Sequence, residues 1–144
     1  MKIDRPVAEI MTPNPLFVGL HTPIDVIHRI FEKNTFHHLP VVHIGKVVGI
    51  ISKSDYLKVQ HMLTCSWSGT VGIQDIYKDF CAADIMSRQP LKIEPLDSIG
   101  LAADIFLVNK LHALPVVQDD ELVGIVTSHD LLAYAFEVSM MTIC

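Results

Sequence analysis

The chain carries the same short polar pattern twice, each time directly after an apolar run. Residues 49–55 and 124–130 both read Gly-x-x-hydroxyl-x-x-Asp, with Ser52 and Asp55 in the first copy and Thr127 and Asp130 in the second. A hydroxyl residue followed three positions later by an acidic residue is the capping pattern of a helix N-terminus, which explains the spacing without any ligand. The same junction offers backbone N–H groups and a hydroxyl to a phosphate or ribose oxygen, and its carboxylate can accept both ribose hydroxyls. One such junction is weak evidence for a nucleotide site, whereas two in a repeated context are stronger evidence.

The polar pattern belongs to a longer internal repeat. Shifting the sequence by 75 residues aligns positions 8–57 with 83–132 without a gap, and nineteen of the fifty pairs are identical. Two copies cannot form an open array, so they must close on each other to hide their cores. We expect a pseudo-twofold pair, with one repeat at 1–65, a linker loop at 66–74 and a second repeat at 75–144. Trp67, in the linker loop, is expected to cover local apolar surface.

Each repeat is predicted to fold as β-α-β-β-α, behind a short helical segment that leads into it. The first copy consists of the helical segment 7–11, an extended piece 16–18, a helix 22–34, strands 39–42 and 47–51 joined by the turn 43–46, and a helix after Ser52. The second consists of 73–86, 91–93, 97–109, the hairpin with its turn at 118–121, and a helix after Thr127. A unit of about 50 residues is too small to be stable alone. The predicted fold class is therefore α+β (α/β), as two such repeats packed with pseudo-twofold symmetry.

Composition limits the class of protein. Half of the 144 residues are hydrophobic and only 19% are charged, which describes a folded chain and excludes a disordered one. The formal charge of −5 and the absence of a Lys/Arg cluster disfavour nucleic acid as a partner. No apolar run reaches the roughly 18 residues of a membrane span, so we expect a soluble, cytoplasmic protein without a membrane partner. The three cysteines are odd in number and far apart, which predicts reduced thiols.

In its repeated motifs the chain resembles the cystathionine-β-synthase-type (CBS) domain, here as the tandem pair called a Bateman module. The motifs are the leading segments at 8–12 and 83–87, the His-x-Leu-Pro-Val-Val strand starts at 37–42 and 112–117, and the two Gly-x-x-hydroxyl-x-x-Asp ends. The resemblance covers nearly the whole chain. It implies a stand-alone regulatory, non-catalytic module that binds an adenosyl ligand such as AMP, ADP, ATP or S-adenosylmethionine in clefts between the repeats. It would require no cofactor and would signal ligand occupancy to an unidentified effector chain.

The resemblance further implies that each cleft takes residues from both repeats. The residues expected at site 1 are Thr22, Ile27, His37, His38, Ile125, Thr127, His129 and Asp130. Those expected at site 2 are Ile50, Ser52, Ser54, Asp55, Asp97, Ala102, His112 and Ala113. Asp130 would hold the ribose hydroxyls at site 1, and Asp55 would do so at site 2. Asp97 stands where the first repeat has Thr22, and a carboxylate repels a phosphate. We therefore expect polyphosphate ligands at site 1, and an uncharged adenosyl tail or no ligand at site 2.

Two other functions remain open on the sequence. In the helix 97–109, Leu107 and Val108 replace Glu32 and Lys33, which makes this helix apolar nearly all round and favours a partner surface. A homodimeric scaffold without ligand is therefore the alternative to the sensor, and both predict a homodimer. The third is an enzyme with a histidine-based metal site. The eight histidines have no acidic or cysteine partners at a fixed spacing, so we predict no metal ligands and no catalytic residues.

Overall fold

The computed structural model describes residues 3–66 and 79–143. Trp67, which is predicted to cover local apolar surface, lies outside the described residues. The chain divides into two compact units that are not the two halves of the sequence. Unit 1 contains Met1–Pro15 together with Leu91–Cys144, and unit 2 contains Leu16–Pro90. The predicted division into repeats at 1–65 and 75–144, with a linker at 66–74, describes the repeat in the sequence and not the compact units. It stays a prediction. The compact units differ from it because the first fifteen residues pack with the C-terminal part of the chain.

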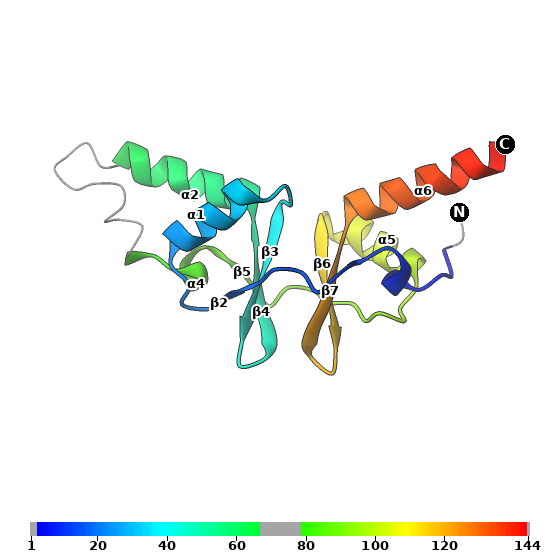
Figure 1. Cartoon of the computed structure of the whole chain (residues 1–144), viewed down its shortest axis with the longest axis horizontal. Helices are drawn as coiled ribbons and strands as arrows, with labels where there is room; N and C mark the ends of the chain where they lie inside the picture. The colour runs from blue at the N-terminus through cyan, green and yellow to red at the C-terminus, as the bar shows by residue number, and fades with distance from the viewer. Residues whose placement is uncertain (1–2, 67–78, 144) are drawn as a thin grey trace. The chain divides into compact units, whose positions relative to one another are not determined.

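Unit 2 is a four-stranded sheet with helices beside it (Figure 1). Its elements are β2 (Val18–Gly19), α1 (Ile24–Lys33), β3 (His38–His43), β4 (Lys46–Ser52), α2 (Lys53–Ser66), α4 (Ala82–Ile85) and β5 (Ser87–Arg88). The strand order is β2-β3-β4-β5, with β2 parallel to β3 and the other pairs antiparallel. The apolar stripe of α1 predicted from the sequence packs on this sheet, and its Ile24, Ile27 and Phe31 are buried with Leu39 and Ile51 of the strands.

Unit 1 repeats this plan with a three-stranded sheet. Its elements are η1 (Val7–Glu9), β1 (Thr12–Pro13), α5 (Ile99–Asn109), β6 (Ala113–Gln118), β7 (Glu121–Thr127) and α6 (Ser128–Ile143). The strand order is β1-β7-β6, and Ile93 forms a parallel bridge to Val116 where unit 2 has the strand β2. Val7, Phe106 and Leu114 are among its core residues. The mixed α/β fold predicted from the repeat is confirmed.

Both hairpins turn through two residues with positive φ. These are Ile44 (φ 51°) and Gly45 (φ 74°) in unit 2, and Asp119 (φ 53°) and Asp120 (φ 66°) in unit 1. Two successive positive φ values match the right-handed twist of the flanking strands, which is why such turns connect short hairpins. The turns predicted at 43–46 and 118–121 are therefore correct in position. Asp tolerates this conformation, whereas a β-branched residue such as Ile44 adopts it only under strain.

The short segment that leads into each repeat belongs to the unit built around the other repeat's hairpin. In unit 1, β1 pairs with β7 through Thr12↔Ile125 and Pro13↔Gly124. In unit 2, β5 pairs with β4 through Gly49↔Arg88 and Ile50↔Ser87. The leading segments also cap helix N-termini, since the Ile99 N–H donates to the Arg5 carbonyl (2.8 Å) and the Ile24 N–H to the Phe80 carbonyl (3.0 Å). The helix predicted over 7–11 is a single 3₁₀ turn, Val7–Glu9, and the strand that follows it was not predicted.

None of the described helices combines the length and the apolar composition that a bilayer span requires.

Candidate functional site

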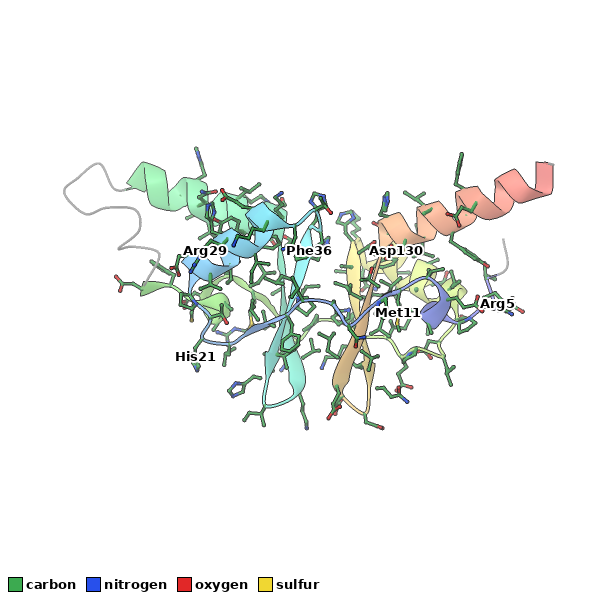
Figure 2. All side chains as sticks on the ribbon, viewed as in Figure 1. Arg5, Met11, His21, Arg29, Phe36 and Asp130 are labelled. Carbon is green, nitrogen blue, oxygen red and sulfur yellow. The ribbon has the colours of Figure 1, made fainter. Side chains whose placement is uncertain are left out.

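The junction between β7 and α6 in unit 1 forms a closed capping box. The Thr127 N–H donates to Asp130 Oδ2 (2.8 Å), and the Asp130 N–H donates to Thr127 Oγ1 (3.2 Å). Both side chains are half-buried, and Figure 2 shows Asp130 at the N-terminal end of α6. The helix-capping interpretation of the pattern is therefore correct. Because the box uses one carboxylate oxygen of Asp130, it holds the carboxylate in a fixed orientation with Oδ1 available to a further donor.

The equivalent junction between β4 and α2 in unit 2 is bonded differently. The Asp55 N–H donates to Ser52 Oγ (3.0 Å), as in unit 1. The Asp55 carboxylate is instead paired with a lysine one turn later in α2, with Lys58 Nζ 3.9 Å from Asp55 Oδ1. The Asp55 side chain is 51% exposed and that of Lys58 76%. The two carboxylates predicted to bind ribose therefore differ in orientation and in neighbouring charge.

The histidine repeated at the start of each hairpin contributes its backbone to the same junction. The Lys53 N–H donates to the His37 carbonyl (2.7 Å), and the Ser128 N–H donates to the His112 carbonyl (3.0 Å). Across the hairpins, His38 pairs with Ser52 and Ala113 pairs with Thr127. Each junction thus brings together the end of one strand, the start of its neighbour and the first turn of a helix, and the His37 and His112 side chains are exposed there.

The predicted site residues divide between the two units as follows. Unit 1 holds Asp97, Ala102, His112, Ala113, Ile125, Thr127, His129 and Asp130; unit 2 holds Thr22, Ile27, His37, His38, Ile50, Ser52, Ser54 and Asp55. Within each unit, the strand-end and helix-start residues lie at one junction. Sites 1 and 2 as predicted each include residues of both units, and this crosswise composition stays a prediction.

Four predicted site residues have structural roles of their own. Thr22 Oγ1 accepts from the Gly19 N–H (2.9 Å), and Asp97 Oδ2 accepts from the Glu94 N–H (2.8 Å), so each closes the turn before its helix. Ile27 and Ala102 are fully buried in the cores of their units. These contacts account for the residue types at the four positions without a ligand.

A cluster around the buried Tyr56 ring, missed by the sequence reasoning, supports the α2 junction. Tyr56 follows Asp55 directly, is 2% exposed, and stacks on Phe31 of α1 with ring centroids 5.7 Å apart. Its hydroxyl is hydrogen-bonded to His28 Nδ1, and His28 Nε2 lies 2.9 Å from Glu32 Oε1. His28 therefore has an acidic partner four residues later in the same helix, and the expectation that the histidines lack such partners is wrong for this residue. The repeat could have revealed the cluster, because its three polar members are replaced together in the second copy by Ala103, Leu107 and Leu131. The packing of Tyr56 on Phe31 holds the first turn of α2 against α1.

Among the described residues, no three His, Cys, Asp or Glu side chains are grouped as metal ligands would be. The exposed rings of His21 and His43 face each other edge to face at 6.4 Å, without a third ligand. The chemistry that the junctions offer is therefore recognition by hydrogen bonds: a carboxylate for paired hydroxyls and helix N-terminal N–H groups for an anion.

Comparison with known proteins identifies related sequences and structures. The family model described as CBS domain matches residues 7–61 and 82–137. Protein MJ1225 of Methanocaldococcus jannaschii is 32% identical over 113 residues, an alignment that covers 75% of this chain and 39% of that protein. The chain therefore spans less than half the length of MJ1225.

Two solved structures have the same fold. The crystal structure of CBSX2 in complex with AMP has a TM-score of 0.76 and 26% identity, covering 94% of this chain and 98% of that one. The CBS domain pair of protein MJ0100, in complex with 5'-methylthioadenosine and S-adenosyl-L-methionine, has a TM-score of 0.70 and 27% identity, covering 91% and 98%.

Proposed function

Because the chain belongs to the CBS domain family, we propose that it is a regulatory module that binds an adenosyl ligand and signals occupancy to an effector protein. The observation that carries the proposal is the Thr127–Asp130 junction, where a half-buried carboxylate is held by the capping box beside a helix N-terminus. The ligand classes come from two structural neighbours, one solved with AMP and the other with S-adenosyl-L-methionine and 5'-methylthioadenosine. AMP, ADP, ATP and S-adenosylmethionine are the candidates.

The proposed ligand contacts are those predicted from the sequence. Asp130 accepts the two ribose hydroxyls at site 1, Thr127 and His129 approach the ribose and phosphate, and Ile125 flanks the base. Asp55, Ser52 and Ser54 have the corresponding roles at site 2. A carboxylate suits the ribose because each of its oxygens accepts a hydroxyl, and hydrogen bonds to an ionised acceptor are stronger than those between neutral groups.

A ligand panel tests this function. We expect at least one of AMP, ADP, ATP and S-adenosylmethionine to raise the melting temperature, because a ligand that binds only the folded state stabilises it by about 2.7 kcal/mol at 100 times its Kd. NADH serves as a larger adenosyl compound, and GMP as a control with the same ribose phosphate and a different base. Absence of any shift at millimolar concentration would contradict the proposal.

The alternative, an interaction scaffold, rests on the apolar surface of unit 1. The helices α5 and α6 pack against each other and expose Leu107 (79%), Val108 (80%), Leu132 (69%) and Phe136 (66%). Exposed apolar side chains gathered on neighbouring helices are typical of an interface. We propose that they form a homodimer, which is compatible with ligand binding and would be the whole function if no ligand binds.

We expect light scattering to give twice the mass of one chain for the wild type. The variant Leu132→Glu with Phe136→Glu should be monomeric, because it places two like charges where the dimer would bury apolar surface. The matched control is Leu57→Glu in α2, where an apolar side chain of similar size is 48% exposed. A wild-type monomer at 100 μM would exclude the dimer, and dissociation by the control as well would exclude this surface as its origin.

A further inference from the structure

The two junctions differ in the charges that flank their carboxylates. At the start of α2, Lys53 occupies the first position, and Lys58 lies about one turn after Asp55, with its Nζ 3.9 Å from Asp55 Oδ1. The equivalent positions of α6 are Ser128 and Ala133, and no lysine or arginine occurs between Ser128 and Ile143. The charged side chains of α6 are Asp130 and Glu137. The first turns of the two helices therefore present different fields to a ligand.

This difference affects how each junction discriminates between ligands by charge. A carboxylate that accepts ribose hydroxyls also repels the phosphates of the same molecule, and the repulsion grows with each phosphate added. At α2, the ammonium group of Lys58 offsets the charge of Asp55 and leaves the second lysine, Lys53, as an excess positive charge. Within α6, neither a lysine nor an arginine is present to offset Asp130. Charges within about 10 Å of one another still interact at 0.1 M salt, so a phosphate held within that distance of Lys58 would be attracted by it.

We propose that Lys58 is a specificity-determining residue that makes the Asp55 junction prefer ADP and ATP, while the Asp130 junction prefers adenosyl ligands of low charge. The proposal rests on the proposed function, since it assigns a ligand class to each of its two sites. It reverses the order expected from Asp97. The Asp97 carboxylate is held toward its own turn by the Glu94 N–H (2.8 Å), whereas the Lys58 side chain is 76% exposed and reaches Asp55 Oδ1 only at 3.9 Å, a loose pairing that leaves its ammonium group able to reorient toward a phosphate.

The series adenosine, AMP, ADP and ATP tests the proposal, because its members differ only in phosphate number. Binding is measured by isothermal titration calorimetry at low salt in an Asp130→Asn background, which removes the stronger carboxylate interaction at the other junction. We expect Lys58→Gln to weaken ATP binding about threefold to tenfold and adenosine binding less than twofold, as for one exposed charge pair. High salt should reduce the difference for ATP. The control Lys46→Gln, which removes an exposed lysine at the start of β4, should change neither ligand.

A second variant, in α6, tests the effect of the lysine without any change to α2. Ala133→Lys in an Asp55→Asn background places a lysine at the equivalent position of α6 and should strengthen ATP binding about threefold to tenfold without affecting adenosine. Equal weakening of adenosine and ATP by Lys58→Gln would overturn the proposal, because Lys58 would then act by positioning Asp55. If the wild type binds none of the four compounds, the proposed function itself fails. If it binds them but Lys58→Gln and Ala133→Lys leave the ATP-to-adenosine ratio unchanged, only the role of Lys58 fails.

Discussion

Replacing Asp130 with asparagine is expected to weaken AMP binding by about 10- to 100-fold while leaving the fold almost as stable as in the wild type. The reason is that two functions of this carboxylate can be separated. An asparagine oxygen still accepts the Thr127 N–H (2.8 Å in the wild type), so the helix cap is retained. The negative charge that strengthens hydrogen bonds from both ribose hydroxyls is lost, and hydrogen bonds to charged groups are worth about 1.5–3 kcal/mol against about 1 for neutral ones. Calorimetry with AMP and thermal unfolding without ligand measure the two effects separately.

Asp130→Ala and Asp55→Asn are the matched comparisons. The alanine variant also removes the carboxylate half of the capping box, although Thr127 Oγ1 still accepts the backbone N–H of residue 130, so it should lose about 1 kcal/mol of stability, the usual worth of one hydrogen bond, in addition to ligand affinity. Asp55→Asn should weaken AMP binding less, because the Asp55 side chain is half exposed and its charge is offset by Lys58, whereas Asp130 is oriented by the capping box before a ligand arrives. An Asp130→Asn protein that binds AMP as tightly as the wild type would show that this carboxylate only caps a helix.

The parts of the fold that could be predicted from the sequence are those determined by residues close together in the chain. The helix predicted over 97–109 begins at Ile99, after Ser98, whose side chain accepts the Leu101 N–H (3.0 Å). Thr127 and Asp130 form the expected capping box for the same reason, since three residues of spacing decide the geometry. The hairpins follow from two apolar runs separated by a short polar turn. In all three cases the interacting residues are close in the sequence, and the most distant pairs, His38 with Ser52 and Ala113 with Thr127, still belong to a single hairpin.

The pairing of each leading segment with the hairpin of the other repeat could not be predicted in the same way. Thr12 pairs with Ile125, more than a hundred residues away, and a two-residue strand carries no periodic signal of its own. The sequence predicts a helical segment that ends at Met11 and gives no indication that residues 12–13 form a strand. A trace of the pairing was nevertheless present in the repeat, because Met11 and Met86 are identical, as are Gly49 and Gly124. Each methionine lies against the glycine of the hairpin that its own segment joins.

The candidate site likewise has a part that could be predicted from the sequence and a part that could not. Its strand-end and helix-start residues could be identified because they form a local motif. The environment of each motif could not, since the ion pair between Asp55 and Lys58 and the packing of Tyr56 on Phe31 depend on side-chain orientation and on contact between helices. The residues that distinguish the two junctions are therefore those at which the repeats differ, whereas the motif itself consists of positions at which they agree.

Gly124→Ala is expected to lower the free energy of unfolding by about 1–3 kcal/mol, the usual cost of overpacking a filled site. Gly124 does not have a positive φ, so the need for glycine here is one of space. A Cβ at this position would lie 2.5 Å from Met11 Sδ and 3.1 Å from the Thr12 carbonyl oxygen. Relief requires the Met11 side chain to reorient and the β1 backbone to move away from β7 by a few tenths of an ångström, and both changes disturb the packing that holds the leading segment in unit 1. Gly49→Ala should have a similar effect, because its Cβ would lie 2.8 Å from Met86 Cγ and 3.0 Å from the Ser87 carbonyl oxygen.

The matched control is Gly19→Ala in β2, where the added Cβ would meet Thr22 Oγ1 at 3.6 Å, an ordinary van der Waals distance. This variant should be neutral or slightly stabilising, since alanine reduces the conformational freedom of the unfolded chain. Urea unfolding of the three variants measures the differences, and a cycle with Met11→Ala separates the two clashes at Gly124. If the methionine is the main obstacle, Gly124→Ala should cost less in the Met11→Ala background, whereas a clash with the backbone persists in both. Wild-type stability of both Gly124→Ala and Gly49→Ala would mean that the leading segments yield without cost and that their pairing with the hairpins contributes little to the fold.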